Sequence, residues 1–196
     1  RPSWCLNMMT AKKLNFGNIM GHVNNVTNLA SLASWTADQF DPTLTWEDIA
    51  WIKDRWNGKL ILKGIMDSED AMLAVKAGAD AIIISNHGGR QLDGAPSTIS
   101  VLPEIVDAVN SKVEVHFDGG VRSGQDVLKA LALGADCIHI GRPYVYGLGA
   151  KGQEGVEIAI EIIKKELDLT MAMCGETNIS NVGLHNLHHN PFKIIN

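Results

Sequence analysis

Polar side chains beside glycine recur at four points of this sequence, each directly after a short apolar run. The first is Lys63, which precedes Gly64, and the second is segment 85–90, Ser-Asn-His-Gly-Gly-Arg. The third is segment 118–122, Asp-Gly-Gly-Val-Arg, and the fourth is segment 141–143, Gly-Arg-Pro. Glycine beside charged groups indicates places where backbone and side chains bind a ligand together.

The second segment holds two groups that suit acid–base chemistry, His87 and Arg90, three positions apart. An imidazole can accept a proton near neutral pH, and a guanidinium can hold a carboxylate through two parallel hydrogen bonds. The pair therefore favours an acidic substrate from which a proton is removed. The alternative is an ordinary surface histidine, which the neighbouring arginine and the position after a strand disfavour.

Segments 118–122 and 141–143 share the order glycine then arginine. Glycine lets backbone N–H groups approach a phosphate, and arginine adds a charge-assisted contact. The predicted phosphate ligands are Gly120, Arg122, Gly141 and Arg142. The alternative is that these glycines only turn the chain. Lys63 ends an apolar strand and needs an anion or a polarised carbonyl if it is buried, unless its ammonium reaches solvent.

Short apolar runs alternate with amphipathic segments between residues 46 and 175. The predicted strands are 60–63, 81–85, 113–118 and 137–140. The predicted helices are approximately 46–57, 67–77, 101–110, 123–133 and 155–167. This alternation is typical of parallel βα units and predicts an α/β fold.

An internal repeat refines the fold prediction. A shift of 56 residues superposes Gly64 on Gly120, Asp70 on Asp126 and segment 78–80 on segment 134–136. Because a βα unit of a (β/α)8 TIM barrel takes roughly 30 residues, the shift equals two units. Phosphate sites in this fold often follow strands seven and eight, so the four strands are predicted to be strands five to eight. An open Rossmann sheet is the alternative, but its G-x-G-x-x-G turn is absent.

The composition excludes several classes of function. A net charge of -5 over 196 residues gives no basic field for nucleic acid. The three cysteines have no disulfide or metal spacing, which favours a reducing, cytoplasmic location. We find no apolar run of about 20 residues and no export leader. Because residue 1 is arginine rather than methionine, we expect that an upstream part is missing.

The ordered motifs 62–64, 85–93, 118–122 and 140–143 closely resemble those of a known enzyme family. This is the FMN-dependent 2-hydroxy acid dehydrogenase/oxidase family, which includes glycolate oxidase, L-lactate dehydrogenase and mandelate dehydrogenase. The resemblance runs from about Trp46 to Cys174. It implies an FMN cofactor on a TIM barrel and the oxidation of an L-2-hydroxy acid to a 2-oxo acid.

The resemblance also implies a role for each residue. His87 would be the base, and Arg90 would bind the substrate carboxylate. Lys63 would stabilise the negative charge of reduced FMN at N1 and the C2 carbonyl, Ser85 would contact the ring or ribityl chain, and Asp118 would bind ribityl hydroxyls. The phosphate would be held by Gly120, Arg122, Gly141 and Arg142. The sequence leaves open whether the proton leaves the α-carbon or the hydroxyl with hydride transfer.

The N-terminal half of the family barrel has no counterpart in this sequence. That half supplies two tyrosines near the substrate, an aspartate that orients the base and part of the flavin pocket. Either another chain or a cleaved portion supplies them, or the chain is an isolated half-barrel. We favour a missing half, because a bare half-barrel leaves strand edges unpaired.

Three segments follow from this assignment. Residues 1–45 correspond to the variable segment after strand four and are expected to form a long loop with weak helical turns, residues 46–175 form the βα units, and residues 176–196 form a C-terminal tail. Two other functions stay open: another FMN- or phosphate-binding barrel, such as an isomerase, and a non-catalytic half-barrel that packs on a partner. A homo-oligomer is also left open.

A lysine pair near the N-terminus and a group of histidines near the C-terminus could each bind a ligand or a surface, but we predict no such role for either. Lys12 and Lys13 lie next to apolar residues and would allow contact with a membrane surface, as in some family members, but the asparagine-rich surroundings favour a soluble loop. The C-terminal histidines have no acidic or cysteine partner at ligand spacing, and we predict no metal there. These histidines are His185, His188 and His189.

Overall fold

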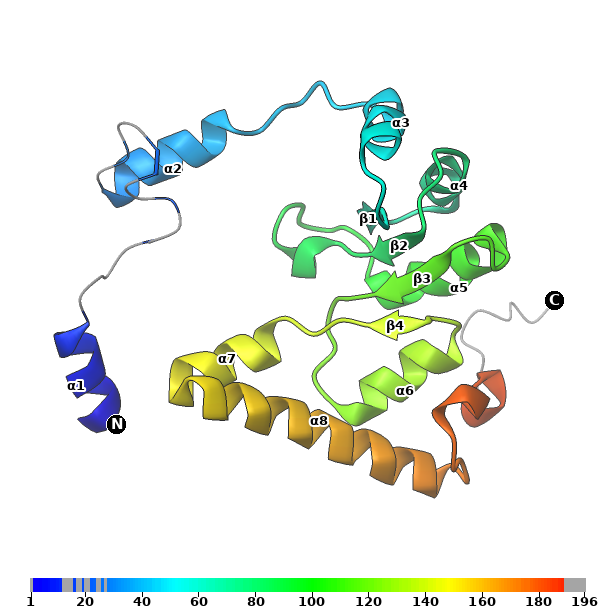
Figure 1. Cartoon of the computed structure of the whole chain (residues 1–196). Helices are drawn as coiled ribbons and strands as arrows, with labels where there is room; N and C mark the ends of the chain where they lie inside the picture. Colours follow the sequence, from blue (N-terminus) through cyan, green and yellow to red (C-terminus); the bar gives the residue numbers. More distant parts are fainter. Residues whose placement is uncertain are drawn as a thin grey trace. The chain divides into compact units, whose positions relative to one another are not determined.

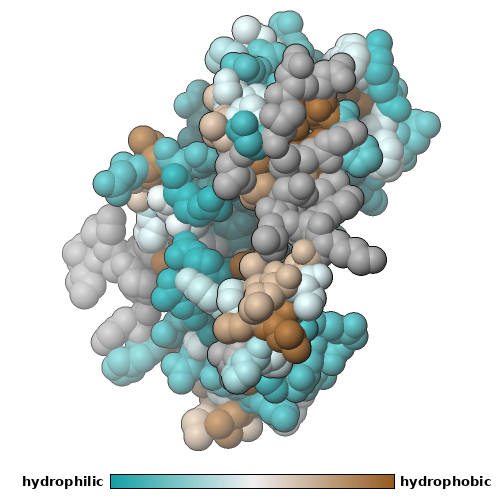
Figure 2. Space-filling model, turned by 90° about the vertical axis from the view of Figure 1, so that its left-hand side faces the viewer, coloured by the Kyte–Doolittle hydropathy of each residue, from teal (hydrophilic) through white to brown (hydrophobic). Residues whose placement is uncertain are grey.

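The computed structural model describes residues 2–11, 16, 19, 22–23, 26 and 28–188. The chain forms two compact units, Arg1–Thr45 and Trp46–Asn196. Within the described residues, no helix is both long and apolar enough to cross a bilayer. The face in Figure 2 is mostly hydrophilic, with hydrophobic residues between the hydrophilic ones.

The first unit contains α1 (Pro2–Thr10) and α2 (Leu29–Asp38). A capping box closes the start of α2: the backbone N–H of Ser31 donates to Asn28 Oδ1 at 2.9 Å, and that of Asn28 donates to Ser31 Oγ at 3.0 Å. The prediction of a loop with weak helical turns is therefore wrong here. Asn28 acts as the N-cap of α2.

Lys12 and Lys13, on which the membrane-contact alternative depends, lie outside the described residues, as does His189.

The second unit is an α/β domain with a parallel sheet (Figure 1). Its strands are β1 (Ile61–Ile65), β2 (Ala81–Ile84), β3 (Glu114–Phe117) and β4 (Cys137–Ile138). Its α-helices are α3 (Trp46–Arg55), α4 (Ser68–Lys76), α5 (Thr98–Val109), α6 (Gly124–Ala132), α7 (Arg142–Lys151) and α8 (Gln153–Met173). Three 3-10 turns complete it: η1 (His87–Gly89), η2 (Ile179–Asn181) and η3 (Leu184–Asn186).

The order of the strands discriminates between the two predicted folds. The sheet order is β1-β2-β3-β4, and all three pairings are parallel. A doubly wound sheet reverses its order at a switch point, whereas barrel strands follow one another around the sheet. The predicted α/β fold with a parallel sheet is confirmed, and its strand order agrees with a segment of a barrel rather than a Rossmann sheet.

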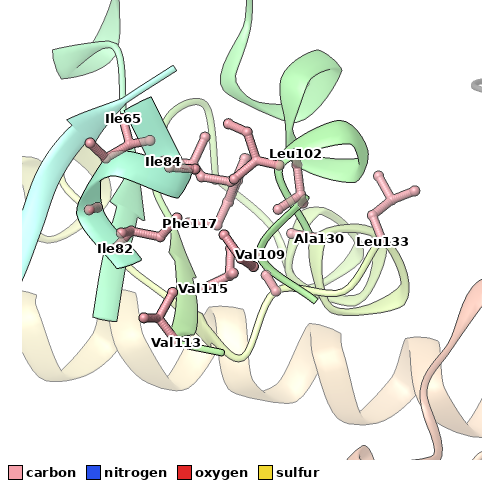
Figure 3. Packing of buried hydrophobic residues seen from close by; sticks show 14 of the residues in the cluster. Ile65, Ile82, Ile84, Leu102, Val109, Val113, Val115, Phe117, Ala130 and Leu133 are labelled. Carbon is pink, nitrogen blue, oxygen red and sulfur yellow. The ribbon is translucent and has the colours of Figure 1, made fainter. Parts of the chain in front are cut away.

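The hydrophobic core lies between the sheet and helices α4, α5 and α6, which Figure 1 shows beside the strands. Ile82 and Ile84 of β2 are fully buried, as are Leu102 and Ile105 of α5. Figure 3 shows Ile82, Ile84 and Leu102 in one cluster with Val115 and Phe117 of β3. Alternate strand residues therefore face the helices.

The remaining strand residues define what we call the opposite face of the sheet. Their register pairs are Ile61 with Ala81, Lys63 with Ile83, Ala81 with Glu114, Ile83 with His116, and His116 with Cys137. Paired residues of parallel strands point to the same side. Ile61 keeps 44% of its surface exposed on this face.

The predicted repeat has a counterpart in hydrogen bonding. Asp80 Oδ2 accepts the backbone N–H of Leu60 at 2.9 Å, and Asp136 Oδ2 accepts that of Val115 at 2.8 Å. Each carboxylate thus ties the start of one strand to the residue before the next. Asp80 also pairs with Lys53 at 2.6 Å and Lys59 at 2.9 Å, and these ammonium groups hold its pKa far below the usual range.

The strand prediction differs from the structure at Gly64. The sequence predicts that β1 ends before this glycine, whereas β1 continues to Ile65. Gly64 has a φ of 102°, and the pairing with β2 shifts register between Lys63 and Ile65. The glycine is therefore a bulge within the strand rather than its end.

Helix α7 was not predicted from the sequence, which indicates only a helix of about 155–167. Two glycines inside α7, Gly147 and Gly149, resemble helix breakers. The structure gives Gly147 a packing role. A Cβ at Gly147 would collide with the carbonyl group of Gly155 in α8, and one at Gly155 would collide with the carbonyl group of Gly147. The backbones of α7 and α8 approach closely at this pair. This packing holds α7, whose first residue is Arg142, in place against α8.

The C-terminal segment folds back through Glu176. Its Oε1 accepts from Asn186 Nδ2 at 2.9 Å and lies 2.8 Å from His185 Nε2, and both contacts lower the pKa of Glu176. His185 therefore has a carboxylate partner nine residues away in the sequence, and the absence of a metal at the C-terminal histidines stays a prediction.

We predict opposite effects for alanine at two glycines of the same helix. Gly147→Ala should lower the free energy of unfolding by about 1–3 kcal/mol, since the added methyl meets backbone that cannot rotate away. Gly149→Ala should raise it by up to about 1 kcal/mol, because a Cβ there meets no heavy atom within 4 Å and alanine favours helix. Urea denaturation of the full-length protein measures both. Equal shifts would contradict the close packing of α7 on α8.

Candidate active site

A cavity of about 380 Å³ opens where the strands end. Eight of the nine residues predicted for the site line it: Lys63, His87, Arg90, Asp118, Gly120, Arg122, Gly141 and Arg142. The ninth, Ser85, is buried and hydrogen-bonds to Lys63. Parallel strands in chain order bring these distant segments to one edge of the sheet.

Lys63, which lies inside β1, connects this strand to the ends of β2 and β3. Its Nζ donates to Ser85 Oγ, after β2, at 2.7 Å and lies 3.3 Å from Asp118 Oδ2, after β3. The lysine side chain is 46% exposed. Both alternatives for Lys63 thus hold together: its ammonium has an anionic partner and also reaches solvent. The fixed cation is available to a negative group entering the cavity.

The loop after β2 is shaped by hydrogen bonds to Asn86. Asn86 Oδ1 accepts the backbone N–H of Gly89 at 3.1 Å, and Asn86 Nδ2 donates to the carbonyl of Pro96 at 3.1 Å. The N–H of His87 donates to Ser85 Oγ at 3.2 Å. His87 itself has a φ of 56°, a left-handed conformation that is uncommon outside glycine. The loop brings the exposed side chains of His87 and Arg90 to the same cavity.

Arg142 links this loop to the end of β4. Its Nη2 donates to the carbonyl oxygen of Gly88 at 2.8 Å. A Cβ at position 88 would lie 2.8 Å from the same nitrogen, so the glycine permits the approach. One guanidinium therefore lies both at the start of α7 and against the turn that carries His87.

The predicted phosphate ligands surround open space. Gly120 lies in a turn held by Asp126, whose Oδ2 accepts the N–H groups of Arg122 and Ser123, each at 3.0 Å. A Cβ at Gly120 or Gly141 would meet no heavy atom within 4 Å. Gly141 also caps α7 with no side-chain hydrogen bond. Backbone N–H groups, a helix N-terminus and two arginines at one cavity suit an anion.

The sequence reasoning missed His139, which lines the same cavity. Its Nε2 lies 3.1 Å from His116 Nδ1, and His116 Nε2 lies 3.2 Å from Glu114 Oε2. Burial, and then the neighbouring His116, lower the pKa of His139, which favours the neutral imidazole. The period of two along β3 places Glu114 and His116 on one face, but it does not predict their approach to His139, which follows a different strand.

A second cavity of about 420 Å³ adjoins the first at the glycine turns. It shares Gly88, Gly120 and Arg142 with the first and is bounded by Thr98 of α5 and Lys129 of α6. It contains neither His87 nor Arg90, so the acid–base groups belong to the first cavity alone.

Comparison with known proteins identifies the family. Residues 1–189 match the family model described as FMN-dependent dehydrogenase. This chain belongs to that family. The resemblance inferred from the motifs is confirmed.

Relatives within the FMN-dependent dehydrogenase family are similar over most of this chain. L-lactate dehydrogenase of Vibrio cholerae is 43% identical over 187 residues, which are 95% of this chain and 50% of that protein. L-lactate dehydrogenase of Pseudomonas syringae pv. syringae is 44% identical over 183 residues, 93% of this chain and 48% of that protein. The chain thus spans about half the length of the curated relatives that it matches.

Two solved structures extend the comparison to the fold. The monotopic membrane protein (S)-mandelate dehydrogenase is 36% identical, with a TM-score of 0.83 over 93% of this chain and 48% of that one. Mandelate oxidase with benzoyl-formic acid is 47% identical, with a TM-score of 0.70 over 73% of this chain and 42% of that one. The fold is therefore similar both to a protein named mandelate dehydrogenase and to one named mandelate oxidase.

We predict that Arg142→Ala loosens the loop that carries His87. Without the bond to Gly88, amide hydrogen exchange in residues 87–94 should become faster by about tenfold, the factor for one hydrogen bond of roughly 1.4 kcal/mol. Arg122→Ala is the matched control, because no side-chain bond from Arg122 to this loop occurs among the described residues. Unchanged exchange in Arg142→Ala would show that Asn86 alone holds the loop.

Proposed function

We propose that this chain is the flavin-binding, base-carrying half of an enzyme that oxidises an L-2-hydroxy acid to a 2-oxo acid. One observation carries the proposal: His87, Arg90 and Lys63 line a single cavity beside the glycine-arginine turns. Relatives named L-lactate dehydrogenase and mandelate oxidase support oxidation over the isomerase alternative.

We infer that the four strands are strands five to eight of a TIM barrel. Support comes from their chain order, from the predicted phosphate site after the last two strands and from the half-length match to relatives. In this assignment residues 1–45 are the variable segment after strand four, residues 46–175 the βα units and residues 176–196 the tail.

The N-terminal half of the barrel, in the same protein or a separate chain, is the proposed partner. The exposed Ile61 lies on the opposite face of the sheet, which a closed barrel would enclose. On α8, Ile158, Ile162 and Leu169 are 41%, 51% and 56% exposed and follow one helical stripe. In a barrel the neighbour of the last helix is the first, so the missing half would cover this stripe.

The residues of the cavity fit FMN, which when bound would accept two electrons from the substrate. The N–H groups at Gly120 and Gly141, with Arg122 and Arg142, would hold the phosphate in the space that a Cβ would otherwise fill. Asp118 would accept hydrogen bonds from ribityl hydroxyls, and Ser85 would contact the ring or the ribityl chain.

Arg90, His87 and Lys63 would bind the substrate, accept its proton and stabilise negative charge on the flavin. The Arg90 guanidinium would hold the substrate carboxylate in a bidentate pair, and His87 Nε2 or Nδ1 would take the proton. The Lys63 ammonium, fixed by Ser85 and Asp118, would stabilise negative charge near N1 and the C2 carbonyl. The left-handed backbone conformation of His87 is strained, and such strain is typical of residues at functional sites.

The cytoplasmic location remains a proposal. The alternative is contact with a membrane surface. A solved relative described as a monotopic membrane protein supports this alternative.

Replacing the base should stop the reaction without releasing the cofactor. Asparagine adopts the left-handed backbone conformation of residue 87 readily, whereas alanine does not. The His87→Asn variant therefore shows the effect of losing the base without added strain in the loop. Both His87→Asn and His87→Ala should reduce flavin at least about 10²-fold more slowly, the usual contribution of a general base. Anaerobic stopped-flow bleaching with L-lactate or (S)-mandelate measures the rate, and flavin content should stay at one per protein. A wild-type rate in His87→Asn would refute the assigned role.

Arg90→Lys should act on substrate affinity. A point charge replaces a planar fork, so the apparent Kd for the hydroxy acid should rise about 10- to 100-fold, as for one charge-assisted hydrogen bond. The limiting reduction rate should change less. Arg55→Lys, on α3, is the control because Arg55 stacks on Trp51 away from the cavity. An unaltered Kd in Arg90→Lys would contradict its contact with the carboxylate.

A further inference from the structure

Three side chains of the kinds that ligate metals converge between β3 and β4. His116 and Cys137 are register partners on the opposite face of the sheet, and His139 lies two residues beyond Cys137, hence on the same face. One ligand atom from each, two imidazole nitrogens and the thiol Sγ, lie within 4.8 Å of one another. The sequence gives no spacing signal for this group, because its members come from two neighbouring strands.

The distances suit a small cation. His116 Nδ1 and His139 Nε2 are 3.1 Å apart. In a tetrahedral zinc site with bonds of about 2.0–2.1 Å to nitrogen, two nitrogens are roughly 3.3 Å apart. The imidazoles therefore need little movement, and Cys137 Sγ, which lies within 4.8 Å of both nitrogens, would move closer to form a bond of about 2.3 Å.

The Glu114 carboxylate contacts the buried imidazole of His116 at the ring nitrogen opposite the proposed metal. Glu114 Oε2 lies 3.2 Å from His116 Nε2, the nitrogen that does not face His139. Histidines bound to metals regularly donate their second N–H to such a carboxylate, which fixes the tautomer. His116 is only 9% exposed, so its ring has few other orientations.

We propose that His116, Cys137 and His139 bind a thiophilic divalent cation, Zn²⁺ in the first place, with Glu114 as the orienting carboxylate. Two imidazoles and one thiolate are a ligand set that zinc accepts. On binding, the Cys137 thiol loses its proton to solvent and each imidazole offers one lone pair. His139 also lines the cavity of Lys63 and Asp118, so a fourth ligand would enter from that side. The site does not depend on the proposed oxidation.

Cobalt tests the site because a bound thiolate gives it a charge-transfer band. The full-length protein, with its flavin and after chelator treatment, is titrated with Co²⁺ and recorded as a difference spectrum against a Zn²⁺-loaded sample. We expect one Co²⁺ per chain, a near-ultraviolet thiolate band and its loss when Zn²⁺ is added. Absence of a stoichiometric band would overturn the proposal and leave the His116–His139 contact as a hydrogen bond.

Matched cysteine variants assign the band. Cys137→Ser should abolish it, whereas Cys174→Ser, which changes an exposed cysteine outside the group, should leave it intact. Binding at the C-terminal histidines would persist in Cys137→Ser and give no thiolate band. A band that survives Cys137→Ser would refute the assigned ligand.

Glu114→Gln tests the orienting role without touching a ligand. Loss of an outer carboxylate weakens metal binding by about 10- to 100-fold, so the Kd for Co²⁺ should rise by that factor. Flavin content, measured in the same samples, reports separately on the proposed function. An unchanged Kd in Glu114→Gln would contradict the orienting role of this carboxylate.

Discussion

Parallel pairing in chain order makes all four strands end at one edge of the sheet, and every feature of the site depends on this constraint. The pairing itself depends on the buried side chains of β2 and β3, because Ile82, Ile84 and Phe117 pack against α5. Residues that face the helices stabilise the domain. The positions just after them, which need not pack, are free to carry charge.

Electrostatic contacts between neighbouring loops hold the site in shape. Lys63 joins β1 to the ends of β2 and β3 through Ser85 and Asp118, while Arg142 joins the end of β4 to the turn at Gly88. Each cation thus has a protein partner before any ligand enters. Because both remain partly exposed, an anionic ligand can share them without the full cost of burying a new charge. The same four strand ends place His139 and its neighbour His116 just beneath this layer.

Local patterns were sufficient to predict most of the domain. The strands were found within a few residues, since runs such as 81–84 are apolar and bounded by turn residues. Lys63, His87 and Arg142 were recognised because glycine and charge follow those strands. Three features depended on contacts between distant segments: the Gly147–Gly155 packing that permits α7, the N-cap role of Asn28 and the approach of His139 to His116. The spacing of residues along one segment does not predict which residues of a distant segment they will contact.

A crystal structure of the full-length protein with FMN tests the central claim most directly, because the claim concerns where the phosphate and the ring lie. We predict phosphate oxygens within about 3 Å of the Gly141 N–H and the Arg142 guanidinium, with the flavin ring beside Lys63 and His87 directed toward it. A phosphate bound elsewhere, or a His87 side chain turned away from the ring, would contradict the account.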